Sequence, residues 1–389
     1  MKTGCGLRIA ICESQGALLN PQSAIPNPPS VHGAPDYEEL ERLGLKPDDV
    51  LDFSSNVNPY GPAEGVHEAI ASVALDRYPD RKCLALQRSL RKFLDLPEDC
   101  VLPANGSSEL IWLTALAFIK PGDSVLVLGP TYCEYARAAE LMGGQVSFCV
   151  AREEHGFVFD AAEIDSQIEA LQPKLVFLCN PNNPTGAVLE PDAIAAWAKR
   201  HRRTMFVVDE AYLAFAAGLE SVLDVSRDNV LVLRSMTKDF GLAGLRLGYA
   251  IANRRLIVCL QEVQPPWSVS GLAQAAGVAA LRNVEHRQRS LKLLAAGKQD
   301  LVKELTEMQL RVVPSAVHFF LVDVSPTHKR GSSLVHPSQG HPANVRYALL
   351  KRGVLIRDCA SFGLPTFIRI STRRPEENQR LVAALREVM

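Results

Sequence analysis

A lysine stands just past an apolar run, in the stretch LVLRSMTKDFGLAGLRLGY (231–249). Residues 231–233 have the composition of a buried strand, and Lys238 follows in a glycine-rich loop. Lysine is rarely placed against a core unless its amine has a task. One such task is to bond the carbon of an aldehyde as a Schiff base. The sequence therefore predicts amine chemistry at Lys238, in a loop that Gly241 and Gly244 allow to turn tightly.

Polar residues also follow the neighbouring apolar runs. The loop NPNNPTG begins at Asn180, the segment DEAY begins at Asp209, and NGSSE (105–109) opens a helical stretch. Taken singly, each has a structural interpretation as a turn, a helix cap or a helix start. Ligands collect at the carboxyl ends of parallel strands, so together these segments predict one shared ligand.

Pyridoxal 5'-phosphate would use an anion site of the kind this chain offers. The N–H groups of Gly106, Ser107 and Ser108 at a helix start favour a phosphate, because they are unpaired and the helix dipole is positive there. Arg246 would add charge, and Ser235 would add a hydrogen bond. We predict that these five residues bind the cofactor phosphate.

The reactive end of the same cofactor needs an acid and an amine. Asp209 would keep the pyridine nitrogen protonated, so that the ring can act as an electron sink. Lys238 would supply the amine that bonds the aldehyde. We therefore predict pyridoxal 5'-phosphate as the cofactor and these two residues as catalytic.

The elements that must position these residues form a regular series. Short apolar runs rich in β-branched residues alternate with segments of helical periodicity, which predicts a parallel sheet covered on both faces. The strands are expected at 124–129, 174–179, 204–209 and 229–234, and the helices at 107–119, 131–142 and 191–201. The predicted fold class is α/β, a mainly parallel sheet of the seven-stranded type sandwiched by helices.

After about residue 275 the pattern changes to that of a smaller α+β domain. We expect helices over 274–308, 343–352 and 375–388, with strands in HFFLVDV, GVLIRDC and FIRIST. The predicted division of the chain is a mobile N-terminal arm, a segment joining the small domain and the dimer interface, a large cofactor-binding domain and a small C-terminal domain. Their expected limits are 1–31, 32–80, 81–275 and 276–389 respectively.

Composition excludes several classes of function. The 389 residues carry a net charge of −1 with no long basic run, so we expect no nucleic-acid partner. The sequence has no stretch of eighteen apolar residues, so we expect no membrane span. Its N-terminus lacks a clear secretory cleavage site. The nine cysteines are scattered without a CxxC pair, which favours a reducing cytoplasm. The insertion 325–342 has three histidines, but an exposed loop is the favoured interpretation, and no metal is predicted.

The blocks NPTG, DEAY and S-x-x-K…R resemble the fold-type I pyridoxal-phosphate enzymes, the aspartate aminotransferase superfamily, from about residue 50 onward. By that resemblance Asn183 and Tyr212 would hydrogen-bond the ring oxygen O3′, Tyr212 would be a third catalytic residue, and Tyr132 would stack on the ring. Tyr78 would reach the phosphate of a neighbouring subunit, which implies a homodimer with shared active sites. Arg369 would grip the substrate carboxylate, although an ordinary strand arginine is the alternative.

A narrower resemblance rests on residues 32–62, 353–385 and the lysine loop. These look like L-threonine-O-3-phosphate decarboxylases of cobalamin synthesis, since the segment 56–59 is NVNP where histidinol-phosphate aminotransferases show NENP. The expected function is decarboxylation of L-threonine O-3-phosphate, or L-serine O-phosphate, to an amino-alcohol phosphate. The alternative is a histidinol-phosphate-type aminotransferase that passes an amino group to 2-oxoglutarate.

The same cofactor residues would serve either reaction, so the choice depends on how a phosphorylated amino acid is held. His32, Asn56, Arg357 and Arg369 are the candidates for binding its carboxylate and phosphate. Arg357 taken alone has a plain alternative as a surface arginine. A non-catalytic relative is disfavoured because Lys238 is intact.

Overall fold

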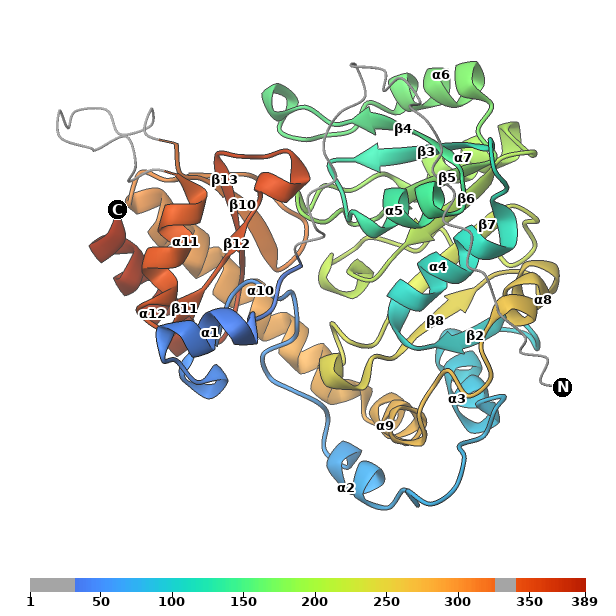
Figure 1. Cartoon of the computed structure of the whole chain (residues 1–389), viewed down its shortest axis with the longest axis horizontal. Helices are drawn as coiled ribbons and strands as arrows, with labels where there is room; N and C mark the ends of the chain where they lie inside the picture. Colours follow the sequence, from blue (N-terminus) through green and yellow to red (C-terminus); the bar gives the residue numbers. More distant parts are fainter. Residues whose placement is uncertain (1–31, 326–340) are drawn as a thin grey trace, which may run out of the picture.

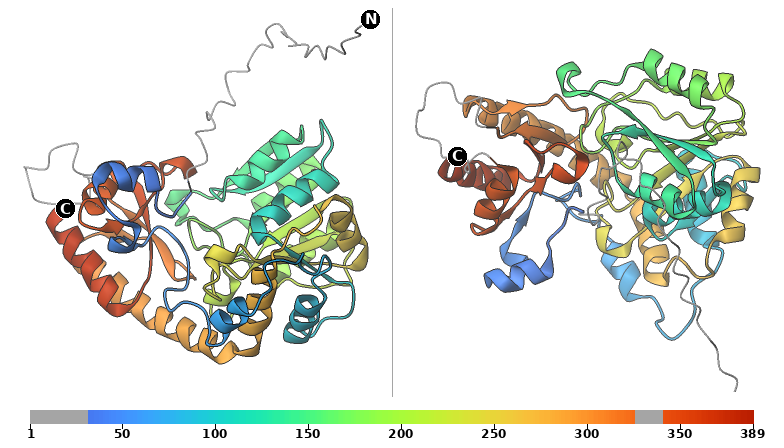
Figure 2. Two further views of the ribbon diagram at one scale, coloured as in Figure 1. Left: turned by 60° about the horizontal axis from the view of Figure 1, so that its bottom comes forward. Right: turned by 45° about the horizontal axis from the view of Figure 1, so that its top comes forward.

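The computed structural model describes residues 32–325 and 341–389. Within them the chain forms a large sheet unit and a smaller one, joined along the long helix α10 (Val284–Glu307) (Figure 1). Both views of Figure 2 show the small unit, orange to red, beside the large sheet. The predicted arm at 1–31 and residues 326–340 of the predicted insertion lie outside the described residues.

The large unit is built on a seven-stranded sheet of order β2-β8-β7-β6-β5-β3-β4. Strand β8 runs antiparallel to both of its neighbours, and the remaining pairings are parallel. The strands are β2 (Val101–Ala104), β3 (Ser124–Gly129), β4 (Gln145–Val150), β5 (Leu175–Cys179), β6 (Met205–Asp209), β7 (Val230–Ser235) and β8 (Gly248–Ile251). The predicted α/β class with a mainly parallel seven-stranded sheet is confirmed.

Alternate residues of these strands face opposite layers of helices, as the two-residue period of a strand requires. Val125 and Val127 of β3 belong to one core, whereas Leu126 and Leu128 belong to the other. The first core is covered by α4 (Gly106–Phe118), α5 (Glu134–Leu141) and α8 (Arg254–Val263). The second is covered by α3 (Leu84–Leu94), α6 (Ala161–Leu171), α7 (Pro191–Arg200) and α9 (Gly271–Arg282).

The small unit has an antiparallel sheet of order β12-β13-β10-β9. Its strands are β9 (Arg311–Val312), β10 (Phe319–Asp323), β12 (Arg357–Asp358) and β13 (Phe367–Ser371), and α10, α11 (Pro342–Leu350) and α12 (Pro375–Val388) cover one face. A separate parallel pair joins β1 (Leu51–Asp52) to β11 (Val354–Leu355) beside α1 (Tyr37–Leu43), while α2 (Val66–Ala71) packs on α9.

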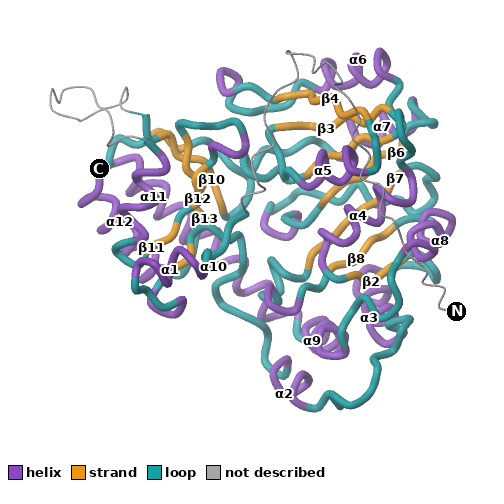
Figure 3. Tube along the Cα trace, viewed as in Figure 1, coloured by secondary structure: helices purple, strands orange, loops and turns teal. Residues whose placement is uncertain are grey.

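The two-residue period of a strand also decides the direction in which Arg369 of the small sheet points. Ile368 and Ile370 of β13 enter the core of the small unit, whereas Phe367 packs into the core of the large one. Arg369 shares the face of Phe367, so it is directed toward the large unit. In Figure 3 loops run through the region between the two groups of strands.

One predicted helix is two helices. The expected stretch 274–308 is divided at Asn283, which ends α9 and accepts a hydrogen bond from the His286 N–H at the start of α10. Local capping of this kind interrupts a helical pattern without changing its period. The predicted domain limits stay predictions. Within the described residues, none of the helices is both long and apolar enough to cross a membrane.

Candidate active site

A cavity of about 560 Å³ opens between the two units, at the carboxyl ends of β5, β6 and β7. This volume is within the usual range for a small-molecule site. Twelve of the predicted site residues line it, namely His32, Asn56, Ser107, Ser108, Tyr132, Asn183, Asp209, Tyr212, Lys238, Arg246, Arg357 and Arg369.

Lys238 enters the cavity from the loop after β7. Its Nζ lies 5.9 Å from the centre of the Tyr212 ring. Burial, helped by the positive charges of Arg369 and Arg246, lowers the pKa of the amine to about 8. The loop is held in place by Asn58, whose N–H donates to the Lys238 carbonyl at 2.9 Å. A fixed amine that loses its proton near neutral pH can act as a nucleophile or a base.

Asp209 ends β6 at the floor of the cavity and is almost fully buried. Its Oδ2 accepts a hydrogen bond from the Tyr135 hydroxyl at 2.9 Å, and its Oδ1 accepts one from the Ala211 N–H at 3.0 Å. Burial raises the pKa of the carboxyl to about 6, although these bonds and Lys238 oppose the rise. A cation placed beside Asp209 would therefore be strongly favoured.

The amino end of α4 forms an open anion site. The residue preceding it, Asn105, makes no side-chain cap, so the first N–H groups of the helix remain for a ligand. Gly106 has a φ of 81°, and a Cβ there would lie 3.0 Å from an Arg246 guanidinium nitrogen. A Cβ on Gly248 of β8 would lie 2.6 Å from the Ser107 nitrogen. These two glycines let the helix end and Arg246 come together.

Four buried polar residues surround the space between the anion site and the small unit. The Asn56 amide donates to the Tyr212 hydroxyl at 3.3 Å, and Asn183 Oδ1 accepts a hydrogen bond from Arg369. Among the described residues the Asn56 Oδ1 and the Arg369 Nε have no hydrogen-bond partner, although both are buried. Buried polar atoms of this kind indicate a ligand that completes their bonding.

Arg357 and Arg369 are direct cross-strand partners in the antiparallel pair β12–β13. Their exposed fractions are only 5% and 4%, and both line the cavity. Arg357 donates to the Ser361 hydroxyl at 2.6 Å, and Arg369 donates to the Ser54 carbonyl. Like charges directly opposite each other destabilise a sheet, so this arrangement indicates a site for anionic groups.

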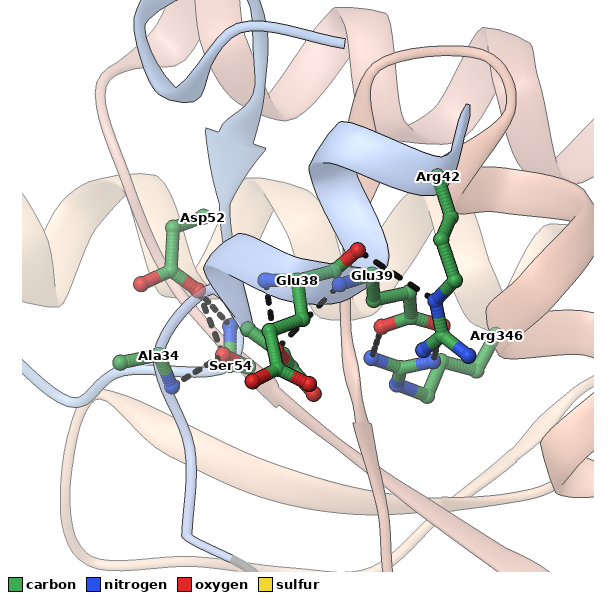
Figure 4. Close-up of polar contacts among 8 residues, drawn as sticks. Ala34, Glu38, Glu39, Arg42, Asp52, Ser54 and Arg346 are labelled. Carbon is green, nitrogen blue, oxygen red and sulfur yellow. Dashed lines mark hydrogen bonds and ion pairs between the residues drawn. The ribbon is translucent and has the colours of Figure 1, made fainter. Parts of the chain in front are cut away.

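The segment carrying His32 is tied to β1, as Figure 4 shows for its Ala34–Ser54–Asp52 hydrogen bonds. A Cβ on Gly33 would lie 2.4 Å from the Ser54 carbonyl oxygen, so only glycine allows this close approach. His32 Nε2 lies 3.4 Å from Glu134 Oε1 rather than standing alone. The predicted substrate residue His32 is thus at the cavity mouth, paired with a carboxylate.

Three predicted residues do not line the cavity. Gly106 contributes its backbone behind Ser107, and the Ser235 hydroxyl lies 2.7 Å from that of Thr237, which does line the cavity. Tyr78 is 81% exposed and stacks on Trp267 with 4.7 Å between ring centres. Its contact with a second subunit stays a prediction.

Sequence reasoning missed Tyr135, Glu134, Thr237 and Ser361, all of which line the cavity. Thr237 is next to Lys238 and could have been found from that position alone. Tyr135 and Glu134 follow Tyr132 by one helical turn or less, but their partners Asp209 and His32 are distant in sequence. Nothing in local spacing indicates those pairings.

The residues present fit pyridoxal phosphate. The open helix end with Arg246 matches a phosphate, buried Asp209 matches a protonated ring nitrogen, and Lys238 matches an aldehyde. The unpartnered Asn56 Oδ1 shows that the buried polar set is incomplete without a ligand.

Comparison with known proteins defines the class. The family model described as aminotransferase class I and II matches residues 48–385, and the chain belongs to this family. It is therefore an enzyme, and its cofactor is pyridoxal phosphate.

A histidinol-phosphate aminotransferase of Symbiobacterium thermophilum is 38% identical over 93% of this chain and 96% of its own length. Among solved structures, a histidinol-phosphate aminotransferase of Clostridium acetobutylicum has a TM-score of 0.76 at 26% identity, covering 87% of this chain and 99% of its own. An L-threonine-O-3-phosphate decarboxylase of Porphyromonas gingivalis has a TM-score of 0.72 at 26% identity, covering 86% and 98%.

The expected decarboxylation of threonine phosphate is wrong. Relatives named histidinol-phosphate aminotransferase are 32–38% identical over about 93% of this chain, which favours the aminotransferase alternative. The physical reason for the error is that both reactions use the same cofactor residues. The NVNP segment and the ending 353–385 gave no information on which Cα bond is broken.

Proposed function

We propose that the protein is a pyridoxal-phosphate-dependent aminotransferase whose amino donor carries a phosphate, of the histidinol-phosphate kind. The observation that carries the proposal is the pair Arg357 and Arg369, buried opposite each other on one cavity wall. A multiply charged anion that binds between two guanidinium groups offsets their mutual repulsion. A phosphomonoester is such an anion.

The cofactor roles follow from position. Ser107, Ser108, Thr237 and Arg246 would hold the phosphate, while Tyr132 would stack on the ring. Asn183 and Tyr212 would bond the ring oxygen. When bound, pyridoxal phosphate supplies an aldehyde that takes up the amino group and a ring that stores an electron pair.

The chain's own residues then move and hold protons. Asp209 would keep a proton on the ring nitrogen of the bound cofactor by accepting its hydrogen bond from a buried position. Lys238, whose amine has a pKa of about 8, would accept the proton from the substrate Cα and, once protonated, would deliver it to the carbon on the other side of the transferred nitrogen. Asn56 and Tyr212 exclude water from this space and orient the ring, because both are buried and joined to each other.

We also infer a homodimer. Tyr78 and Trp267 form an exposed aromatic pair, and paired exposed aromatic rings are typical of association surfaces. Light scattering of the purified protein tests this, and a monomer at micromolar concentration would contradict it.

The enzymatic proposal is tested with the purified holoenzyme and a panel of amino donors, with and without 2-oxoglutarate. We expect glutamate to form with L-histidinol phosphate and to need the keto acid. The unphosphorylated donor, L-histidinol, is the matched control and should be used far less efficiently. Equal use of both donors would overturn the role of the arginine pair, and turnover without a keto acid would overturn transamination.

A further inference from the structure

Three side chains of different ligand type meet at the mouth of the cavity. These are His32, Cys133 and Glu134, whose ligand atoms all lie within 4.8 Å of one another. Imidazole, thiolate and carboxylate are the three groups that bind Zn²⁺ in proteins. We propose that these residues form a site for a thiophilic divalent cation, Zn²⁺, and that its occupation blocks the substrate end of the cavity.

The distances are close to those of a tetrahedral site. Bonds of about 2.0 Å to nitrogen and oxygen and about 2.3 Å to sulfur place ligand atoms roughly 3.3–3.7 Å apart. His32 Nε2 and Glu134 Oε1 are already 3.4 Å apart. The other distances between ligand atoms are at most 4.8 Å and would have to shorten by about 1 Å on binding. A small rotation of the side chains provides this.

The charges also balance. A thiolate and a carboxylate together neutralise a divalent cation, and burial lowers the pKa of His32, which keeps the imidazole in its neutral, metal-binding form. Burial and Glu134 raise the pKa of the Cys133 thiol, so its proton must leave to solvent as the metal–sulfur bond forms. Arg137 and Arg357 face the same cluster and oppose the cation.

Arg137 is the group that must move. Its guanidinium lies 3.3 Å from Glu134 Oε1, but its side chain is 49% exposed and can turn toward water. Only the arginine side of this pair is exposed, since Glu134 is buried, so the cation would have to replace Arg137 as the charge partner of that carboxylate. Zinc coordination by three protein ligands is worth more than that contact.

The ligands are held from behind, as metal sites require. The other Glu134 oxygen, Oε2, accepts a hydrogen bond from Trp112 Nε1 at 3.1 Å. His32 is fixed by the close approach of Gly33 to Ser54 and by the Ala34–Ser54 hydrogen bond visible in Figure 4. The site therefore needs little reorganisation of the backbone.

Binding is tested on the holoenzyme with Co²⁺ as a probe, because tetrahedral Co²⁺ gives visible d–d bands at longer wavelength than the cofactor absorbs. We expect one equivalent to produce these bands and Zn²⁺ to abolish them. Cys133→Ser removes a ligand and should weaken Zn²⁺ binding by more than the roughly 10–100-fold that loss of a group behind a ligand costs, and His32→Gln provides a second variant if the first folds poorly. Cys259→Ser changes another partly buried cysteine, on α8, and should bind like the wild type.

An absent band in the wild type, or an unchanged one in both site variants, overturns the site. The blocking effect rests on the proposed function and is measured separately. Zn²⁺ should inhibit transamination competitively with the phosphorylated donor, chelator should reverse it, and each variant is compared with its own metal-free rate. Zinc bound without inhibition would overturn the blocking role. If no donor is turned over, the cobalt titration still decides whether the site exists.

Discussion

Removal of the Tyr135 hydroxyl should change the protonation of Asp209. The hydroxyl donates to Asp209 Oδ2 at 2.9 Å, and both side chains are buried. A hydrogen bond to a charged group is worth about 1.5–3 kcal/mol, and one pKa unit corresponds to about 1.4 kcal/mol. Tyr135→Phe should therefore raise the pKa of Asp209 by about one to two units above its value of about 6. Near neutral pH the cofactor-free protein would then carry a largely protonated carboxyl.

The assay is cofactor affinity as a function of pH, because only ionised Asp209 favours a protonated ring nitrogen. In Tyr135→Phe the pH at which affinity is half-maximal should shift upward by about one to two units, with about a 10-fold or greater loss near neutral pH. Tyr249→Phe removes a hydroxyl from another buried tyrosine, in β8, and controls for general loss of packing. An unshifted profile in Tyr135→Phe would refute the role of this hydrogen bond.

Three further outcomes are expected. Arg357→Gln should raise the KM for a phosphorylated donor by about 10-fold or more and leave the Tm of the cofactor-free protein unchanged or higher, because it removes a cross-strand repulsion. The control is Arg352→Gln, which changes an arginine that pairs with Glu387 outside the cavity. A clear fall in Tm in Arg357→Gln would contradict the argument. Gly248→Ala should lower the free energy of unfolding, measured in urea, by about 1–3 kcal/mol, because the added Cβ meets backbone atoms. Gly244→Ala, where the added Cβ meets open space, should lower it less. Equal losses would count against the close-approach explanation. The pKa of Asp209 in the folded, cofactor-free protein is raised to about 6 from 3.8, so its contribution to stability is present below about pH 4 and lost by about pH 6. Asp209→Asn should therefore gain stability relative to the wild type over that interval. Parallel unfolding profiles of the two proteins would show that the shift is absent.

Much of the large unit was predictable because its strands can be recognised from short stretches of sequence. The expected run 124–129 coincides with β3, the predicted runs for β5 and β6 begin one residue early, and the run predicted for β7 is displaced by one residue at both ends. Buried parallel strands are continuous apolar runs, and the helices between them show their own period. The break at Asn283 was missed because a cap depends on one side chain and leaves the periodicity intact.

The placement of Lys238, Asp209 and the NGSSE turn also followed from the sequence, since each lies at or shortly after the end of a strand or at a helix start. Parallel pairing of β5, β6 and β7 brings these ends to one edge of the sheet. By contrast, the type of reaction did not follow, because a decarboxylase and an aminotransferase share these residues.

The sequence by itself predicted the fold class and the cofactor, and it led to the proposal that Lys238 reacts with that cofactor, because these depend on residue types and short spacings along the chain. Only the tertiary structure decided that Arg357 lies opposite Arg369, that Tyr135 bonds Asp209, and that His32 meets Glu134. Those contacts join residues far apart in sequence. They are produced by strand register and by the packing of the small unit against the large one, which no local pattern specifies.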